Sequence, residues 1–293
     1  MKVISYSIFG YERARVESCF DFNTYLRGIM LNLRFNRLIY PGWQTSLETD
    51  KVTYEAFESL FKPLVDSGVL IVNRNKNDAK LCEAMLWRLK PIYWADVEVL
   101  LCRDLDAIAT YRERQAVEHW LSHDTKAFHA ITDSVSHDLP LLGGMIGTRP
   151  YLFTSRTVAK TFEELMGMCK GIDLGVKGSD QTFLNQVLYP MFGQNGADSI
   201  TQHYFNGHGN TFLSDFHTCT CPPPQGHRDN CPNNFKIDLP DELKESNSVC
   251  GHIGASGWYE TATFRFLRKY WDRFDDLIKI EKQYPQIFYW NAQ

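Results

Sequence analysis

The stretch EVLLCRDLDAIATYRERQAVEHWL (residues 98–121) joins an apolar run to a helical pattern through two acidic residues. Residues 97–101 are mostly apolar and partly β-branched, which predicts a short buried strand. Thr110 and Glu113 have the spacing of a helix capping box, and apolar residues at 116, 117, 120 and 121 fall on one face of the following helix. The acidic pair is therefore predicted to lie on a loop between a strand and a helix.

That acidic pair is Asp104 and Asp106. In open α/β sheets, ligands bind at the carboxyl ends of the strands. Two close carboxylates repel one another unless a proton or a cation relieves them, and a divalent ion with oxygen ligands does so. A bare D-x-D also fits two solvated loop residues, or the nucleophile motif of certain phosphatases.

Composition limits the class of protein. The chain has 293 residues, 44% of them hydrophobic and 23% charged, which is an ordinary globular balance with enough length for a sizeable core. The net charge of −4 does not favour a nucleic-acid binder. No apolar stretch approaches the roughly 20 residues of a membrane span, and the N-terminus shows no signal peptide. We therefore expect a cytoplasmic protein whose eight cysteines are mostly reduced.

Strand and helix patterns alternate through the first half of the chain. The expected strands are residues 2–10, 44–49, 69–72 and 97–102, and the expected helices are residues 24–39, 54–68 and 78–94. This order predicts an α/β fold, with a mostly parallel sheet flanked by helices.

The pattern loosens after residue 122. Short strands are expected at 126–132 and 141–148, and helices at 155–171, 179–192 and 259–284, the last as one long helix. Residues 203–258, rich in Gly, Pro, Asn, Cys and His, resist assignment. Without a clear linker we expect a single domain over 1–293.

The segment LCEAMLWRLKPIYWADVEVLLCRDLDA (residues 81–107) resembles GT-A glycosyltransferases of the glycogenin-like family (glycosyltransferase family 8). The resemblance implies a GT-A, Rossmann-like fold and a nucleotide-sugar donor. It divides the single domain into a nucleotide-sugar-binding half (1–125) and an acceptor-binding half (126–293). It makes Arg88 the arginine that approaches the donor diphosphate, and Asp104 and Asp106 ligands of Mn²⁺ or Mg²⁺. Arg103 is a further candidate for a diphosphate contact.

The segment GSDQTFLNQVLYP (residues 178–190) resembles the D-Q-x-x-L-N signature of the same family, with Leu184 and Asn185 completing it. There the Asp and Gln lie beside the transferred sugar and the acceptor, which implies catalytic roles for Asp180 and Gln181. The resemblance also implies transfer with retention. If the enzyme inverts instead, Asp180 or Asp133 is the expected base. Plain helix capping explains the same residue types.

Two adjacent glycines, Gly143 and Gly144, lie in LLGGMIGTRP (residues 141–150), and glycine allows a close backbone approach to a ligand. Related enzymes carry a small-residue strand here that lines the sugar pocket, although a tight turn would use the same residues. The surrounding segment also resembles uncharacterised bacterial and viral GT-A proteins, whose recurrent Asp and His match Asp133 and His137.

The resemblance implies a third metal ligand, a histidine near the C-terminus. VCGHIGASGWYE (residues 249–260) offers His252, and His217 is the rival. The usual Lys-Pro-Trp ending of this family motif is absent. Separately, Cys219, Cys221, His227 and Cys231 have the residue types of a structural Zn²⁺ site, or else form a surface loop with free thiols.

The resemblance to the GT-A fold implies a nucleotide base at the end of the first strand, with Tyr6 or Ser7 as its contact and Asp50 near the base or ribose. The leading hypothesis is a metal-dependent glycosyltransferase that moves a sugar from a nucleotide-diphosphate donor to an acceptor hydroxyl. The acceptor stays open among glycan, protein, lipid and modified nucleic-acid base. The alternatives are a D-x-D phosphatase and a non-enzymatic, zinc-stabilised interaction protein.

Overall fold

A computed structural model describes residues 1–17, 22–132, 139–194, 199–204, 241–248 and 260–288. Within these residues seven strands form one sheet, in the order β3-β2-β1-β4-β6-β5-β7. The strands are β1 (Lys2–Ile8), β2 (Gln44–Asp50), β3 (Ile71–Asn75), β4 (Val99–Arg103), β5 (Phe128–Thr132), β6 (Met145–Thr148) and β7 (Ile200–Tyr204). All neighbours pair in parallel except β6, which runs antiparallel to both β4 and β5.

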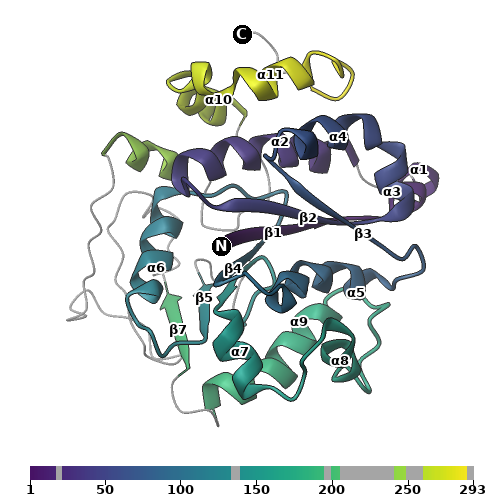
Figure 1. Ribbon diagram of the computed structural model, residues 1–293, viewed down its shortest axis with the longest axis vertical. Helices are drawn as coiled ribbons and strands as arrows, with labels where there is room; N and C mark the ends of the chain where they lie inside the picture. Colours follow the sequence, from purple (N-terminus) through teal and green to yellow (C-terminus); the bar gives the residue numbers. More distant parts are fainter. Residues whose placement is uncertain (18–21, 133–138, 195–198, 205–240, 249–259, 289–293) are drawn as a thin grey trace.

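Helices cover both faces of the sheet (Figure 1). They are α1 (Tyr11–Glu17), α2 (Phe22–Ile39), α3 (Lys51–Ala56), α4 (Glu58–Asp66), α5 (Leu81–Leu86), α6 (Tyr111–Leu121), α7 (Pro150–Arg156), α8 (Phe162–Gly167), α9 (Ser179–Phe183), α10 (Glu260–Arg268) and α11 (Asp275–Glu281). The predicted class, a mostly parallel sheet flanked by helices, is confirmed, and it is consistent with a GT-A, Rossmann-like architecture.

The alternation of side chains along the central strands separates two cores. On β1, Ile4, Tyr6 and Ile8 face the core under α2, whereas Val3 faces the opposite core. The first core also receives apolar residues of α10 and α11, which lie over α2 and α4 as an outer layer (Figure 1). The second core lies between the sheet and α5, α7 and α9. Burial on both sides explains why β4 is apolar up to its last residue, Arg103.

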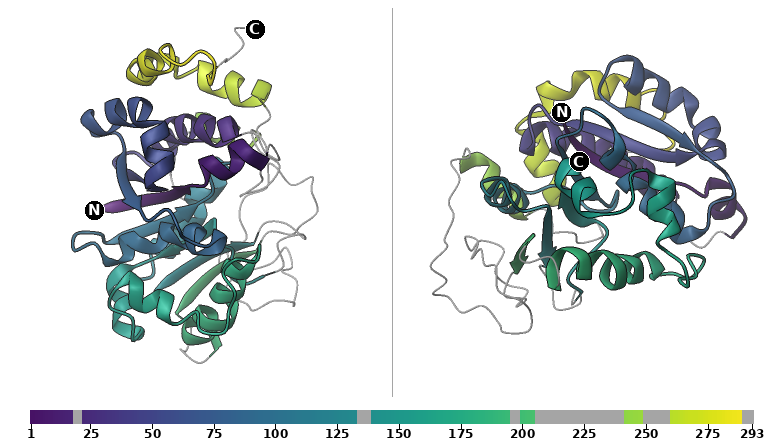
Figure 2. Two further views of the ribbon diagram at one scale, coloured as in Figure 1. Left: turned by 90° about the vertical axis from the view of Figure 1, so that its right-hand side faces the viewer. Right: turned by 60° about the horizontal axis from the view of Figure 1, so that its bottom comes forward.

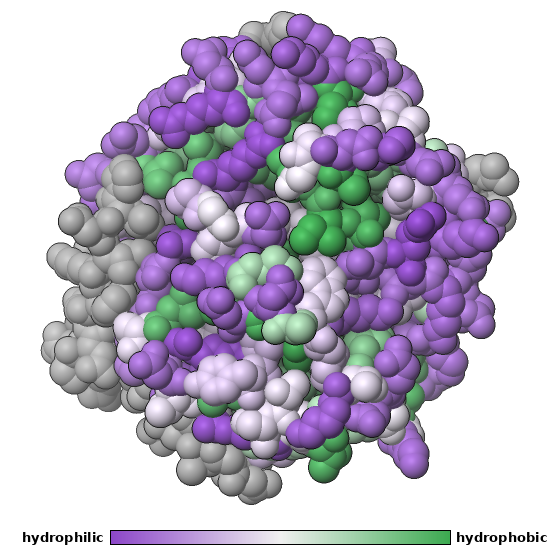
Figure 3. All heavy atoms as spheres, viewed as in Figure 1, coloured by the Kyte–Doolittle hydropathy of each residue, from purple (hydrophilic) through white to green (hydrophobic). Residues whose placement is uncertain are grey.

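The surface reflects this layering. On the face shown in Figure 3, hydrophilic residues predominate, and hydrophobic ones gather between the upper helices and the sheet. Among the described residues, no helix has the length and apolar character needed to cross a bilayer.

Several expected helices are shorter than predicted. The helix expected at 54–68 is divided at Phe57 into α3 and α4, and the one at 155–171 is replaced by α7 and α8. After α5 the chain tightens into a 3₁₀ helix, Trp87–Tyr93, which contains Pro91. The helix α9 continues as π-helical turns, Leu184–Leu188 and Pro190–Gln194.

One further expectation, at the C-terminal end, is wrong. The predicted single helix over 259–284 is instead α10, a 3₁₀ helix (Trp271–Phe274) and α11, because the backbone at Tyr270 leaves the helical region. Within the unassigned stretch 203–258, the structure describes a 3₁₀ helix, Asp241–Ser248. The strand β7 ends at the start of that stretch and pairs with β5. Figure 2 shows the outer position of the C-terminal helices from two other directions.

A cluster of buried histidines joins α6 to β5 and β7. The Nδ1 atom of His119 and the Nε2 atom of His203 lie 3.0 Å apart, and the ring of His129 stacks on Trp120 with a centroid distance of 5.4 Å. Burial first, and the neighbouring histidines next, lower the pKa of each ring, that of His119 from 6.5 to about 4. All three rings are therefore neutral at neutral pH.

This cluster predicts loss of stability in mild acid. The unfolded chain binds protons on these histidines below their ordinary pKa of 6.5, whereas the folded chain does not until far lower pH. The free energy of unfolding should therefore fall between about pH 6.5 and about pH 4. Urea unfolding at about pH 7 and about pH 5 measures the fall, which should be smaller in His129→Phe, a change that keeps a ring against Trp120. An equal fall in both proteins would contradict the prediction.

Candidate active site

The candidate site lies at the carboxyl edge of the sheet, where β1 and β4 are neighbours. After β1 the chain proceeds outward to β2 and β3, and then crosses to the other side of β1 to form β4. The loops after β1 and β4 therefore leave in different directions, which opens a crevice at this point of the sheet. Asp104 and Asp106 follow β4 directly, so the sequence predicted their place correctly.

Asp104 is held by a buried arginine. The guanidinium of Arg88, from the 3₁₀ helix after α5, forms an ion pair with the Asp104 carboxylate, and its Nε donates to the carbonyl of Met85 at 2.8 Å. Arg88 is buried, whereas 43% of the Asp104 side chain remains exposed. The carboxylate therefore has one face on a fixed cation and the other open to solvent or a ligand.

Asp106 adds a second carboxylate with no positive partner of its own among the described side chains. Burial, and then the charge of Asp104, raise the pKa of Asp106 above its ordinary range. Burial first, and then the charges of Asp106 and Asp104, raise the pKa of Tyr25 in α2. A carboxylate whose proton affinity is raised by a neighbouring carboxylate marks a place where a cation would be favourable.

Gly143 and Gly144 are packed against these charged groups. A Cβ atom on Gly144 would lie 1.9 Å from the Oδ2 atom of Asp104, a distance that no real Cβ could occupy. A Cβ on Gly143 would lie 3.3 Å from Arg88 and 3.4 Å from Asp180. Gly144 therefore allows the loop to approach Asp104 more closely than any other residue would, and Gly143 packs tightly against Arg88 and Asp180.

Asp180 and Gln181 reach the same place from α9. Asp180 is fully buried, and its Oδ1 atom has no hydrogen-bond partner within the described part of the chain. Its charge acts on Arg88, and its Oδ2 atom lies beside Gly143. A buried carboxylate oxygen without a partner is unfavourable unless a ligand completes the site.

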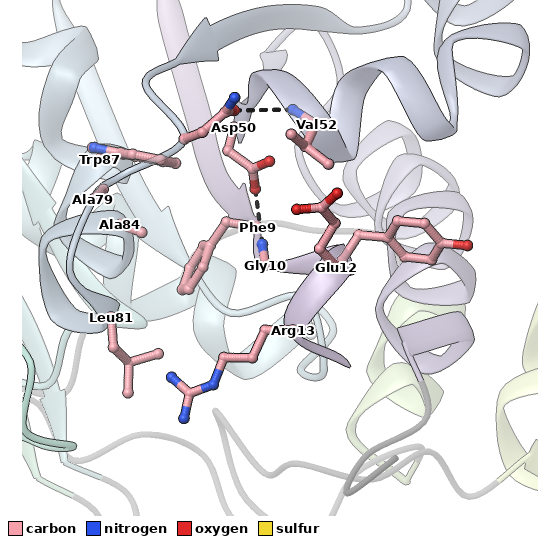
Figure 4. Close-up of a pocket in the computed structure, with 12 residues that line it drawn as sticks. Phe9, Gly10, Glu12, Arg13, Asp50, Val52, Ala79, Leu81, Ala84 and Trp87 are labelled. Carbon is pink, nitrogen blue, oxygen red and sulfur yellow. Dashed lines mark hydrogen bonds between the residues drawn. The ribbon is translucent and has the colours of Figure 1, made fainter. Parts of the chain in front are cut away.

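A pocket of about 440 Å³ lies where β1 and β2 end (Figure 4). One wall is apolar and consists of Phe9, Trp87 and the small side chain of Ala84. The rings of Phe9 and Trp87 meet edge to face, with their centroids 6.0 Å apart. Polar residues, among them Asp50 and Asn77, line the rest. Trp87 directly precedes Arg88, so the pocket and the charged cluster share one helical segment.

The structure separates the three residues predicted to hold the base. Asp50 does line the pocket, and its Oδ2 atom accepts from the Gly10 amide at 2.8 Å, which ties the end of β2 to the loop after β1. Tyr6 instead lies in the core, where its hydroxyl donates to Asn32 at 3.1 Å. The two-residue alternation of β1 turns Tyr6 toward α2, and neither it nor Ser7 lines this pocket.

Arg103 has a different environment from the one predicted. Its side chain is buried, pairs with Glu113 of α6 at 2.8 Å and donates to the carbonyl of Ile146 on β6 at 2.8 Å. Arg103 therefore braces the end of β4 from inside, under the D-x-D loop. Thr110 caps α6 as predicted, but the Glu113 side chain binds Arg103 and Tyr40 rather than closing the capping box.

Other predicted ligands lie outside the described residues. These are Asp133, His137, His217 and His252, together with the four proposed zinc ligands Cys219, Cys221, His227 and Cys231. Among the residues that the structure does describe, no three His, Cys, Asp or Glu side chains are grouped so as to hold a metal ion.

Sequence reasoning missed most of the pocket. Phe9, Gly10 and Trp87 line it, and only the Phe-Gly pair after the first strand gave a local signal. Gly10 has a φ of 77°, which a glycine adopts freely and which turns the chain away from β1. The part played by Trp87 depends on the packing of α5 against the sheet, which no local pattern reveals.

Comparisons with known proteins complete the description. No family model and no curated protein matches the sequence. Among solved structures, the chain is similar to the glycosyltransferase GlyE of Streptococcus pneumoniae TIGR4 (11% identity, TM-score 0.43, 69% of this chain and 44% of that one). It is also similar to a glycosyltransferase involved in glycosylation of the major capsid of PBCV-1 (8% identity, TM-score 0.42, 70% of this chain and 82% of that one). A third similar structure is the mannosyltransferase PcManGT of Pyrobaculum calidifontis, in complex with GDP-Man and Mn²⁺ (14% identity, TM-score 0.37, 65% of this chain and 52% of that one).

The chain spans less than half of the GlyE structure and about half of the PcManGT structure. These identities and TM-scores are too low to assign any of the three activities to this chain.

Proposed function

We propose that this protein transfers a sugar from a nucleotide-diphosphate donor to an acceptor hydroxyl, with a divalent ion bound at Asp104 and Asp106. One observation carries the proposal. The D-x-D pair, a buried arginine and a buried carboxylate converge at the crevice between β1 and β4, beside a pocket with an aromatic wall. That combination suits a ligand with an aromatic base, a diphosphate and a polar group to be transferred.

The carboxylates fit a divalent ion in part. Asp104 and Asp106 supply oxygen ligands, the kind that Mn²⁺ and Mg²⁺ prefer, and their mutual repulsion would be relieved by a cation. We propose His252 as the third protein ligand, with His217 as the rival. A divalent ion bound there would neutralise negative charge that develops on the departing diphosphate.

Arg88 and the pocket account for the donor. In glycosyl transfer, the bond from the anomeric carbon to the diphosphate oxygen breaks, and the electron pair stays on the leaving oxygen. The fixed guanidinium of Arg88 stabilises that charge without having to reorganise. We place the nucleoside in the pocket, with its base against Phe9 and Trp87 and with Asp50 and Asn77 toward the ribose.

Asp180 and Gln181 are the proposed residues beside the transferred sugar. A buried carboxylate there would stabilise positive charge at the anomeric carbon while the new bond to the acceptor oxygen forms. The D-Q-x-x-L-N resemblance favours retention, in which the proton of the acceptor hydroxyl would pass to the departing diphosphate oxygen. If the reaction inverts, Asp180 or Asp133 is the candidate base that takes this proton. We leave the acceptor open.

A thermal-shift screen tests the proposal, because a ligand that binds only the folded protein raises its apparent stability. UDP, GDP, ADP and CDP, and their sugar conjugates, are compared with and without Mn²⁺. A stabilisation that requires both one of the nucleotides and Mn²⁺ is the expected result. No stabilisation by any nucleotide would overturn the proposal and favour the interaction-protein alternative.

Gly144→Ala provides a local test of the metal site. The new methyl group requires the Asp104 carboxylate to move, because their ideal separation would be 1.9 Å. We expect Mn²⁺ affinity, measured by titration calorimetry, to fall about tenfold, as it does when groups that orient a ligand are changed. Gly167→Ala is the control, since a Cβ at Gly167 meets nothing within 4 Å. Equal Mn²⁺ affinity in the two variants would contradict the prediction.

A further inference from the structure

Leu141 begins the glycine loop 141–144, and one side chain, Asn185, forms hydrogen bonds with both its amide and its carbonyl. The Leu141 amide donates to the Oδ1 atom of Asn185 at 2.9 Å, and the Nδ2 atom of Asn185 donates to the Leu141 carbonyl at 2.8 Å. The same Nδ2 atom also donates to the carbonyl of Gln181 at 2.8 Å. Asn185 therefore joins the loop to the helical turn that carries Asp180.

Gln181, one helical turn earlier, holds the next part of the loop. With its amide oriented to satisfy both atoms, it donates to the Leu141 carbonyl at 3.0 Å and accepts from the Gly143 amide at 3.0 Å. The side chain of Leu141 is itself buried in the second core, so the loop is anchored at its first residue. These contacts fix the backbone of residues 141–143 relative to α9.

The position of the loop matters because of what it touches. Gly143 lies against Arg88 and Asp180, and Gly144 leaves no room between itself and Asp104. A shift of the loop by a fraction of an ångström would therefore change the space between the D-x-D carboxylates and Asp180. In the proposed function, that space receives the sugar.

We infer that Asn185 is a positioning residue, which fixes the glycine loop 141–144 and thereby shapes the subsite for the transferred sugar. The inference rests on the proposed function. Asn185 makes no contact with Arg88 or Asp104 in the described hydrogen bonds, so it acts through the loop. Its loss should therefore weaken binding of the sugar while leaving the site for the nucleoside diphosphate largely intact.

The test compares Asn185→Ala with Gln186→Ala, a control at the exposed next residue. The first measurement is hydrogen exchange of the full-length proteins, which requires no ligand. Loss of Asn185 should speed exchange in peptides covering 139–145 about tenfold, with no change in β1 or β4. The second measurement is calorimetric titration, with Mn²⁺ present, of UDP against UDP-glucose and of GDP against GDP-mannose.

The expected result is that Asn185→Ala weakens the nucleotide sugar about tenfold, while its affinity for the matching nucleoside diphosphate changes less than about twofold. A purely structural defect would weaken both equally and would speed exchange beyond the loop, which would overturn the inference. Unchanged exchange at 139–145 would also overturn it. If wild-type protein binds none of UDP, GDP, ADP and CDP or their sugar conjugates, the proposed function fails, and with it the sugar subsite, whatever the exchange data show of the loop.

Discussion

Replacing Asp106 by asparagine should abolish Mn²⁺-dependent nucleotide binding and leave the fold intact. A unit charge about 4 Å from another contributes about 4 kcal/mol at an effective dielectric constant of about 20, so loss of one carboxylate beside a divalent ion should weaken binding by at least about 100-fold. Titration calorimetry of Mn²⁺ with the nucleotide identified by the thermal-shift screen measures the loss.

The structure also predicts what the same substitution does to the unliganded protein. Burial and the repulsion of Asp104 both destabilise the charged form of Asp106 and so raise its pKa. Asparagine removes that repulsion, so the melting temperature without ligand should be unchanged or slightly higher. Asp124→Asn, at an exposed acid after α6, is the control and should alter neither property. Retention of Mn²⁺-dependent binding by Asp106→Asn would refute the assignment of the metal site.

The part of the fold that the sequence predicted well depends on local patterns. The apolar run of β4, the cap at Thr110 and the alternation of strands and helices through the first 121 residues all appear in the structure. Because parallel strands place their carboxyl ends at one edge, this order alone put the D-x-D pair at the crevice. Arg88 and Asp180 were reached only through the resemblance, since nothing local distinguishes them from other surface or capping residues.

What the sequence could not reveal depends on contacts between distant segments. β7 has the polar sequence ITQHY, and it becomes a strand by pairing with β5, about 70 residues earlier. The sequence made Arg103 a candidate for a diphosphate contact, but it could not show that the Arg103 side chain pairs with Glu113 of the following helix. Apolar spacing over 259–284 could not show the break at Tyr270, because the same residues also suit three short helices that cover α2.

The attachment of those C-terminal helices leads to the largest expected effect on stability. Arg34 of α2 and Glu281 of α11 form a bidentate ion pair, with both nitrogen–oxygen distances at 2.6 Å and both side chains buried. The guanidinium also lies 5.4 Å from the ring centre of Trp271. Glu281→Gln keeps the shape of the side chain but leaves the Arg34 cation buried without its counter-ion, which should lower the free energy of unfolding by about 3–5 kcal/mol.

The same two helices supply a matched control. Arg37 and Asp276 form a second ion pair between α2 and α11, with side chains 31% and 47% exposed. Asp276→Asn should lower the free energy of unfolding by about 1 kcal/mol at most, because water and salt screen an exposed pair. Urea unfolding followed by tryptophan fluorescence should therefore show a large drop in midpoint for Glu281→Gln, a small one for Asp276→Asn, and the same slope for both.

A double replacement separates the loss of charge balance from the loss of contact. In Arg34→Met combined with Glu281→Leu, neither member of the buried ion pair between α2 and α11 remains charged. The apolar side chains can pack against Trp271 and Phe274. This variant should recover most of the stability that Glu281→Gln loses, since a well-packed apolar pair commonly matches a buried ion pair. If instead the double variant is as unstable as Glu281→Gln, the paired geometry itself holds α11 to α2, and the explanation from an unpaired buried cation is wrong.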